Sequence, residues 1–221
     1  MLLALDTSTE HLGLALYDGQ QVRSEVWWYA GRRHTQTLAP WIQRLLEANG
    51  LQARDLKAIA VATGPGSFTG LRAGMAVAKA MALALGFPLI GVFSLDVVVA
   101  GIPHLPQHML LALLPMGRGR LAAGWYRWRR NHWHAEGPPF LVTPEELQSI
   151  ITEPTLVAGE MPPSVRTLLE RHPRARLMPP PLNVRRAGWL AFLAWERLQK
   201  GLVDDPVTLT PYYLGGQTKK P

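Results

Sequence analysis

The stretch that most restricts the fold is LLALDTSTEHLGLAL near the start of the chain, where an acidic turn separates two apolar runs. Both runs are short enough for β-strands, so the sequence predicts strands at 2–5 and 12–17 that pair as a hairpin. Asp18-Gly19 is a strong turn signal, and the residues at 22–29 are expected to add a third strand. An antiparallel sheet is therefore expected to open the chain.

Helices and strands then alternate. Apolar residues recur at helical spacing from Leu38 to Leu46, and Pro40 is expected to kink this helix or delay its start. A strand at 56–62, a glycine-rich loop, an alanine-rich helix and a strand at 88–93 follow. This order predicts an α/β fold with a mixed sheet flanked by helices.

The amino-acid composition changes after Gly101, where prolines become frequent. Further strands and helices are expected at 110–114, 121–128, 143–151, 156–158, 165–171 and 184–199, with a turn near Arg130-Asn131. We expect two lobes, residues 1–101 and a smaller α/β lobe at 102–221. The helix near 184–199 is a candidate to pack back on the first lobe.

Composition limits the class of protein. The chain has 221 residues, of which 48% are hydrophobic and 18% charged, as in a folded globular protein. No apolar run approaches the ~20 residues of a membrane span, and Asp6 and Glu10 argue against a signal peptide. The absence of cysteine excludes disulfides and thiolate metal sites, so we expect a cytoplasmic protein. The net charge of +7 suggests an acidic or nucleic-acid partner, or only a solvated basic face.

The acidic turn has the chemistry of a phosphate site. A carboxylate at the end of a strand, followed by hydroxyl groups, can hold a hydrated Mg²⁺ and a phosphate, as in actin-like ATPases and sugar kinases. Here these residues are Asp6, Thr7, Ser8 and Thr9. The alternative is that they only satisfy the backbone amides of the turn.

The glycine-rich loop could bind an anion or only permit close packing. Its residues are Gly64, Pro65, Gly66 and Ser67, and a hydroxyl group there can cap the helix that follows. Unlike a P-loop, it has no lysine to reach a phosphate.

These motifs together resemble a known family. The chain resembles the TsaB (YeaZ) family of bacterial proteins in four places: LALDTSTEHLGLAL, His34, GPGSFTGLRAGMAVAKAMALALGFPLIGVFSLD and the final PYYL. This family is also called glycoprotease-family or peptidase M22-like. Its members are needed for threonylcarbamoyladenosine at position 37 of tRNA. The first hundred residues match in order and spacing, and the second half matches loosely. The resemblance implies an actin-like fold of the hexokinase and Hsp70 kind, with two ribonuclease H-like lobes.

The resemblance also implies a catalytic paralogue, TsaD, whose two metal-binding histidines follow the equivalent strand. Ser94 and Val98 stand at those places in this chain, so no metal site is expected there. His104 and His108 have the same spacing, but the prolines around them disfavour the helix that would bring their rings together. His34 is expected to pack or cap, and 156–160 is at best a remnant of a second phosphate loop.

We therefore expect a non-catalytic subunit that binds and activates a TsaD-like enzyme, with the two phosphate-type loops as structural remnants. The resemblance implies no tightly bound cofactor, ATP or ADP only in complex with partners, a TsaE-like ATPase in a larger complex, and a homodimer when the chain is alone, without a membrane. Transfer RNA would be contacted indirectly or through the basic second half.

Two other classes of function stay open. The first is an independent metalloprotease or ATPase of the glycoprotease family. The second is a basic tRNA-binding module, in which Trp125, Trp128 and Trp133 stack on bases beside Arg127–Arg130. A hairpin with an exposed basic turn explains the same alternation and is the favoured interpretation.

The partner surface is expected on the two helices of the first lobe, through which the resemblance implies a four-helix contact. Small residues allow a second helix to approach closely, and flanking cations help to set its register. The contact residues expected are Leu38, Trp41, Leu45, Arg72, Ala73, Ala76, Lys79, Ala80 and Leu83. The alternative is an ordinary surface of good helix formers.

Overall fold

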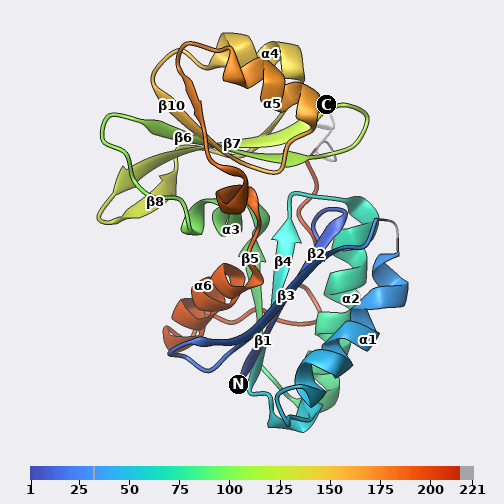
Figure 1. The fold of residues 1–221 in the computed structure, drawn as a ribbon. Coiled ribbons are helices and arrows are strands. Elements are labelled where there is room, and N and C mark those ends of the chain that lie inside the picture. Colours follow the sequence, from blue (N-terminus) through green and yellow to red (C-terminus); the bar gives the residue numbers. More distant parts are fainter. Residues whose placement is uncertain (32, 215–221) are drawn as a thin grey trace, which may run out of the picture. The chain divides into compact units, whose positions relative to one another are not determined.

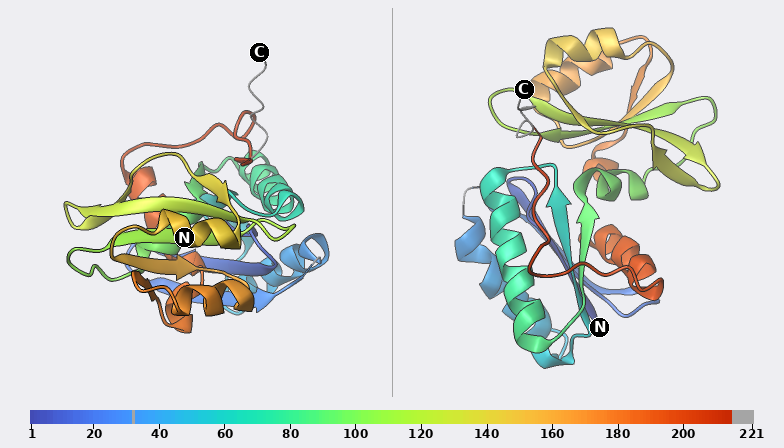
Figure 2. Two further views of the ribbon diagram at one scale, coloured as in Figure 1. Left: turned by 90° about the horizontal axis from the view of Figure 1, so that it is seen from above. Right: turned by 180° about the vertical axis from the view of Figure 1, so that it is seen from behind.

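The computed structural model describes residues 1–31 and 33–214, which form two compact units. The first unit contains 1–97 and 186–212, and the second contains 98–185 together with Tyr213 and Leu214. Residues 186–212, expected in the second lobe, belong with the first unit because α6 (Ala187–Gln199) packs on its sheet. Each unit has one mixed sheet (Figures 1 and 2).

The sheet of the first unit has the strand order β3-β2-β1-β4-β5. The strands β1, β2 and β3 are antiparallel, as the sequence predicted, while β4 and β5 extend the sheet in parallel with β1. Their bounds are Leu2–Asp6, His11–Tyr17, Val22–Tyr29, Ala58–Gly64 and Leu89–Phe93.

Helices cover both faces of this sheet. Alternate residues of β1 point to opposite faces, so Leu3 joins one apolar cluster and Leu2 the other. The helices α1 (His34–Glu47) and α2 (Phe68–Leu85) cover the first face, and α6 covers the second, as both figures show. The acidic turn lies at the end of the central strand of this layered unit.

The helix α1 runs without interruption across Pro40, so the expected kink or delayed start is wrong. Proline removes one helical donor, whose partner would be the carbonyl of Gln36. Both residues are exposed, so water can satisfy that carbonyl.

The helix α2 is mostly apolar, and Arg72 and Lys79 are its charged residues. It begins at the Ser67 cap, whose hydroxyl accepts from the amide of Gly70, and ends at Gly86 with φ +69°. Within the described residues it is the one helix long and apolar enough to cross a membrane, with a mean hydropathy of 1.3. Because Leu71, Met75 and neighbouring residues are buried on the sheet, this is weak evidence for a membrane span.

The second unit has the strand order β11-β10-β6-β7-β8, with β9 paired to β7. Its helices α4 and α5 pack over one apolar cluster that includes Leu111, Leu147 and Leu169. The strands β6 to β11 span Met109–Pro115, Leu121–Arg129, His132–Ala135, Phe140–Val142, Thr155–Gly159 and Ala175–Leu177, and the helices α4 and α5 span Pro144–Ile150 and Pro163–Glu170. Three short elements, α3 (Ser94–Ala100), η1 (Ala53–Asp55) and η2 (Pro180–Asn183), complete the chain.

Candidate functional site

The acidic turn after β1 is closed by its own hydrogen bonds. One carboxylate oxygen of Asp6, Oδ1, accepts from the amide of Ser8 at 2.9 Å, and the Thr7 hydroxyl donates to the carbonyl of Gly70 at 2.8 Å. The Thr9 hydroxyl accepts from the amide of His11 at 3.2 Å. The residues at 6–9 are at most 3% exposed. Asp6 and Thr9 thus accept from amides of the turn, whereas the hydroxyl of Thr7 joins the turn to α2.

The glycine-rich loop is bonded directly to this turn. The amide of Ser67 donates to the carbonyl of Ser8 at 2.6 Å. The hydroxyl of Ser94 lies 2.7 Å from the Ser8 hydroxyl and accepts from the amide of Gly64 at 3.0 Å. Ser94, which stands where a metal-binding histidine would be expected, thus connects the two loops. Its structural role was not apparent from the sequence.

Three glycines let the chain close over the turn without a gap. A Cβ added at Gly66 would lie 2.3 Å from the Ser8 carbonyl oxygen, and one at Gly70 would lie 2.2 Å from that of Thr7. A Cβ at Gly74 would lie 2.2 Å from the Thr7 hydroxyl. The start of α2 and the glycine-rich loop therefore lie in direct contact with the acidic turn.

His34 supports the same turn from the first residue of α1. Its Nε2–H donates to the carbonyl of Thr9 at 2.8 Å, since a carbonyl oxygen can only accept. The ring is 3% exposed, and Nδ1 has no partner among the described residues. The expectation that His34 packs is confirmed.

Among residues 1–31 and 33–214, no group of three histidine, cysteine or acidic side chains is arranged to hold a metal. Val98 is buried in the interior at 5% exposure. The region of His104 and His108 is not helical, as its prolines predicted. The His104 ring stacks on Trp128 at 4.9 Å, and Nδ1 of His108 lies 2.9 Å from the carbonyl of Pro106.

One stripe of α2 is exposed. Arg72, Ala76, Ala80 and Leu83 lie on it, and Leu83 is 61% exposed. The stripe begins at Phe68, whose ring lies 5.0 Å from the guanidinium of Arg72. The exposed helix face expected around Ala76 is therefore present.

Lys79 lies beside this stripe and is half-buried. Its ammonium group donates to the carbonyl of Val207 at 3.2 Å. The amide of Val207 in turn holds the pKa of Asp205 below its usual value. The hydrogen bond from Lys79 thus links the segment after α6 to α2.

Three of the expected contact residues are buried within the chain itself, contrary to the exposed position expected of them. Leu38, Leu45 and Ala73 are 1%, 8% and 9% exposed, because they lie on the stripes of α1 and α2 that face the sheet. Trp41 is half-buried and packs on Trp28, with 5.2 Å between the ring centroids.

An apolar groove separates the exposed surfaces of α1 and α2. Its volume is about 410 Å³. Ala39, Ile42, Leu46, Leu51, Val77 and Met81 supply its apolar lining. The sequence did not reveal this groove, because it depends on the spacing between two helices that are distant in the chain.

The tryptophans of the basic hairpin pack within their own unit. Trp128 and Trp133 are opposed in the register of β7 and β8, and the Trp133 indole donates to the carbonyl of Ile102 at 2.8 Å. Arg130 and Asn131 form the exposed turn with φ values of +49° and +64°. The interpretation as a hairpin with an exposed basic turn is confirmed.

Comparisons with known proteins agree on one family. The family model for tRNA N6-adenosine threonylcarbamoyltransferase (TsaD) matches residues 28–140. The chain is similar to the tRNA threonylcarbamoyladenosine biosynthesis protein TsaB of Escherichia coli, with 32% identity over 65% of this chain and 63% of the relative. TsaB of Bacillus subtilis is 34% identical over 59% of this chain and 56% of the relative. The chain thus spans about 60% of the length of these curated relatives.

Solved structures extend the similarity. YeaZ from Pseudomonas aeruginosa has a TM-score of 0.77 and 26% identity, over 96% of this chain and 99% of that one. An activator of 2-hydroxyisocaproyl-CoA dehydratase from Clostridium difficile has a TM-score of 0.53 at 8% identity, over 90% of this chain and 96% of that one. The fold is the expected actin-like one, with two mixed sheets flanked by helices.

Proposed function

Because this chain belongs to the TsaB (YeaZ) branch of the tRNA N6-adenosine threonylcarbamoyltransferase family, we propose that it is a non-catalytic subunit in the formation of threonylcarbamoyladenosine at position 37 of tRNA. In this proposal it binds and activates a TsaD-like catalytic subunit in the cytoplasm.

The observation that carries the proposal is the closed acidic turn. In an actin-like ATPase, the equivalent turn must stay open to receive a phosphate and its cation. Here Thr7 and Ser8 are bonded to Gly70 and Ser67, and Ser94 occupies the place expected for a metal-binding histidine. This geometry supports a scaffold role for the site rather than a catalytic one.

The surface proposed for the TsaD-like partner is the groove between α1 and α2 with the exposed stripe of α2. The groove offers apolar area, and Ala76 and Ala80 let a helix approach closely between Arg72 and Leu83. A pair of partner helices of matching apolar character would bury this area in a four-helix contact. When the chain is alone, a second copy would cover the same surface and form a homodimer.

The other partners and the nucleotide are proposed from the same family resemblance. A TsaE-like ATPase would join the larger complex, and tRNA would be bound by the assembly or through the basic second unit. ATP or ADP would bind only in the presence of partners, because the acidic turn of the isolated chain is closed.

The test is reconstitution with the TsaD-like protein of the same organism. Modification of tRNA should require this chain. Ala76→Glu should weaken the pairing by more than about 2 kcal/mol, roughly 30-fold, because it places a charge at the centre of a packed contact. Ala135→Glu on exposed β8, away from the proposed contact, is the matched control and should leave the pairing unchanged.

Three results would contradict the proposal. They are full tRNA modification without this chain, unchanged pairing of a folded Ala76→Glu protein, and ATP hydrolysis by the isolated chain that Asp6→Ala abolishes. Stoichiometric zinc or iron retained after chelation would instead support an independent metalloenzyme.

A further inference from the structure

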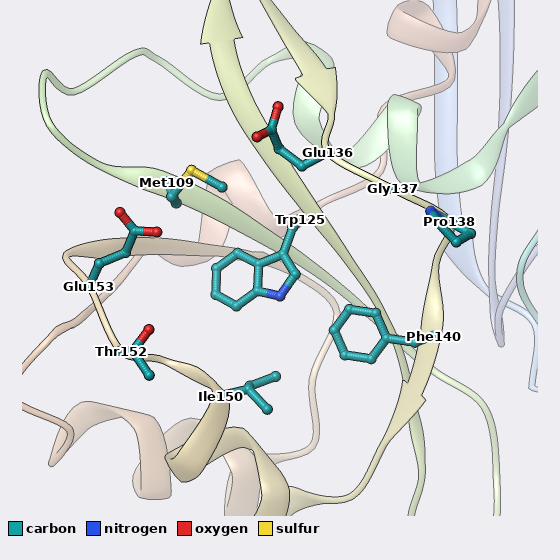
Figure 3. Close-up of a pocket in the computed structure, with 9 residues that line it drawn as sticks. All are labelled: Met109, Trp125, Glu136, Gly137, Pro138, Phe140, Ile150, Thr152 and Glu153. Carbon is teal, nitrogen blue, oxygen red and sulfur yellow. The ribbon is translucent and has the colours of Figure 1, made fainter.

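The second unit contains a pocket that the proposed function does not use. Its volume is about 370 Å³, which is within the range of small-molecule sites. The residues that shape it include Met109, Trp125, Glu136, Phe140, Ile150 and Glu153, drawn in Figure 3. They come from the start of β6, from β7, from the segment between β8 and β9 with the start of β9, and from the end of α4 with the loop after it.

The interior of the pocket suits a flat ring. Figure 3 shows the indole of Trp125 at its centre, with the ring of Phe140 on one side and Ile150 below. Trp125 is half-buried, and its position is set by β7, where it lies opposite Leu111 of β6. An exposed aromatic face held on a strand is the platform on which a nucleobase stacks.

Two polar residues of the loop after α4, Thr152 and Glu153, line the pocket, and Glu153 supplies an acceptor carboxylate. Glu153 lies on the side of Trp125 opposite Phe140 in Figure 3 and is exposed. Within the described part of the chain its carboxylate makes neither an ion pair nor a hydrogen bond. An ionised carboxylate accepts hydrogen bonds and donates none, so it selects a ligand with N–H groups.

The rim of the pocket carries two guanidinium groups. Arg127 and Arg129 follow Trp125 at alternate positions of β7, on the same face and at steps of roughly 7 Å. Glu136 accepts from Arg127 at 3.1 Å and from Arg129 at 2.7 Å. One carboxylate shared by two guanidinium groups leaves a net positive charge, and each side chain keeps further N–H groups. Such groups are suited to a phosphate.

We propose that this pocket binds one nucleotide whose base carries an exocyclic amino group. The base stacks on Trp125, its amino group donates to Glu153, and its 5′-phosphate is held by Arg127 and Arg129. The nucleotide is either free or an unpaired residue of an RNA strand, since both present the same base and phosphate. This site is in the second unit and does not depend on the surface of α1 and α2.

A cationic ligand is the competing possibility. An ammonium or guanidinium group could stack on Trp125 and pair with Glu153. The two guanidinium groups on the rim oppose it, whereas they attract a phosphate. Competition between AMP and N-acetylarginine amide distinguishes a nucleotide site from a cation site.

The decisive measurement follows the indole N–H signal of Trp125 by NMR, assigned with Trp125→Phe. Titration with AMP should shift this signal. Inosine monophosphate has a carbonyl oxygen in place of the amino group and a proton on the neighbouring N1. At the position of the amino group it therefore presents an acceptor to Glu153, and it should bind about tenfold more weakly or worse. Adenosine, which lacks the phosphate, should also bind more weakly than AMP.

Variants at exposed residues then assign the contacts. In Glu153→Gln the preference for AMP over inosine monophosphate should disappear, because an amide both donates and accepts. Arg127→Gln should weaken AMP and leave adenosine unchanged. Glu145→Gln, an exposed carboxylate on α4, is the matched control and should change neither.

A single-stranded oligoadenylate separates the two sources of the nucleotide. Binding much tighter than that of AMP and weakened by salt supports an RNA strand, and equal binding supports a free nucleotide. The proposal is overturned if neither AMP nor the oligomer shifts the Trp125 signal, or if AMP and inosine monophosphate bind equally well. Displacement of AMP by N-acetylarginine amide, with tighter binding of the amide, would establish a cation site instead.

Discussion

Replacement of Gly70 by alanine tests whether α2 is pressed against the acidic turn. In an open helix this change stabilises a protein by up to about 1 kcal/mol, because alanine is the better helix former. In this chain the new Cβ would lie 2.2 Å from the Thr7 carbonyl oxygen and 3.0 Å from Nε2 of His34. The first neighbour is backbone, so the contact cannot be relieved by rotating a side chain.

The expected size follows from the groups that must move. Overpacking in a buried site costs about 1–3 kcal/mol. Displacing Thr7 also strains its hydrogen bond to the Gly70 carbonyl, and loss of one buried hydrogen bond costs a further 1–3 kcal/mol or so. After the gain in helix propensity, we expect Gly70→Ala to lower the free energy of unfolding of the first unit by about 2–4 kcal/mol.

Urea unfolding followed by circular dichroism measures this difference. Gly188→Ala in α6 is the matched control, since its new Cβ would meet the end of the exposed Val22 side chain at 3.0 Å and the Glu25 carboxylate oxygens at ordinary contact distances of 3.6 and 3.7 Å. The control should keep the stability of the parent or exceed it. A Gly70→Ala protein as stable as the parent would refute the closed packing of α2 on the turn.

Three further predictions concern charged groups. Asp6→Asn should lower the stability of the first unit by about 1–3 kcal/mol, measured by urea unfolding, because the carboxylate closes the turn. Glu160→Ala should cost the second unit about 3–5 kcal/mol, since it removes the carboxylate paired with the 1% exposed guanidinium of Arg185, whereas Arg185→Met should cost less because Glu160 is 14% exposed. Backbone amides, that of Gln21 first, hold the pKa of Asp18 below its ordinary value of 3.8. Its contribution to stability is therefore complete above that value and lost as the pH falls through the lowered pKa, and a pH series of thermal unfolding should show that Asp18→Asn removes this dependence.

Regular patterning made much of the fold predictable. The stripe of apolar residues in α1, the Ser67 cap and the Gly86 stop of α2 are local signals, and the structure has both helices. The short helix α3 was missed because its residues, SLDVVVA, include three consecutive valines. A β-branched run favours a strand by propensity, and only the packing of Leu95 and Val97 overrides it.

The residues of the site could be predicted from the sequence, but the close packing of its two loops could not. The sequence identified the turn at 6–9 and the loop at 64–67 as two separate motifs, and the structure brings them together. Whether the motif is open or closed depends on close approaches at Gly66 and Gly70, which no spacing rule encodes. The nucleotide pocket was missed for a similar reason, because Trp125 and Glu153 meet only after β7 and α4 have packed.

The first unit is discontinuous in the chain, and this affects how it is made. Its five strands are complete by Phe93, but α6, which covers one face of their sheet, begins only at Ala187. During synthesis the ribosome must therefore deliver the whole of 98–185 before that face is covered. Until then Leu2, Ala4 and Ile90 form a bare apolar layer, to which chaperones or other nascent chains can bind. A message truncated before α6 would thus yield an aggregation-prone product rather than a smaller working lobe.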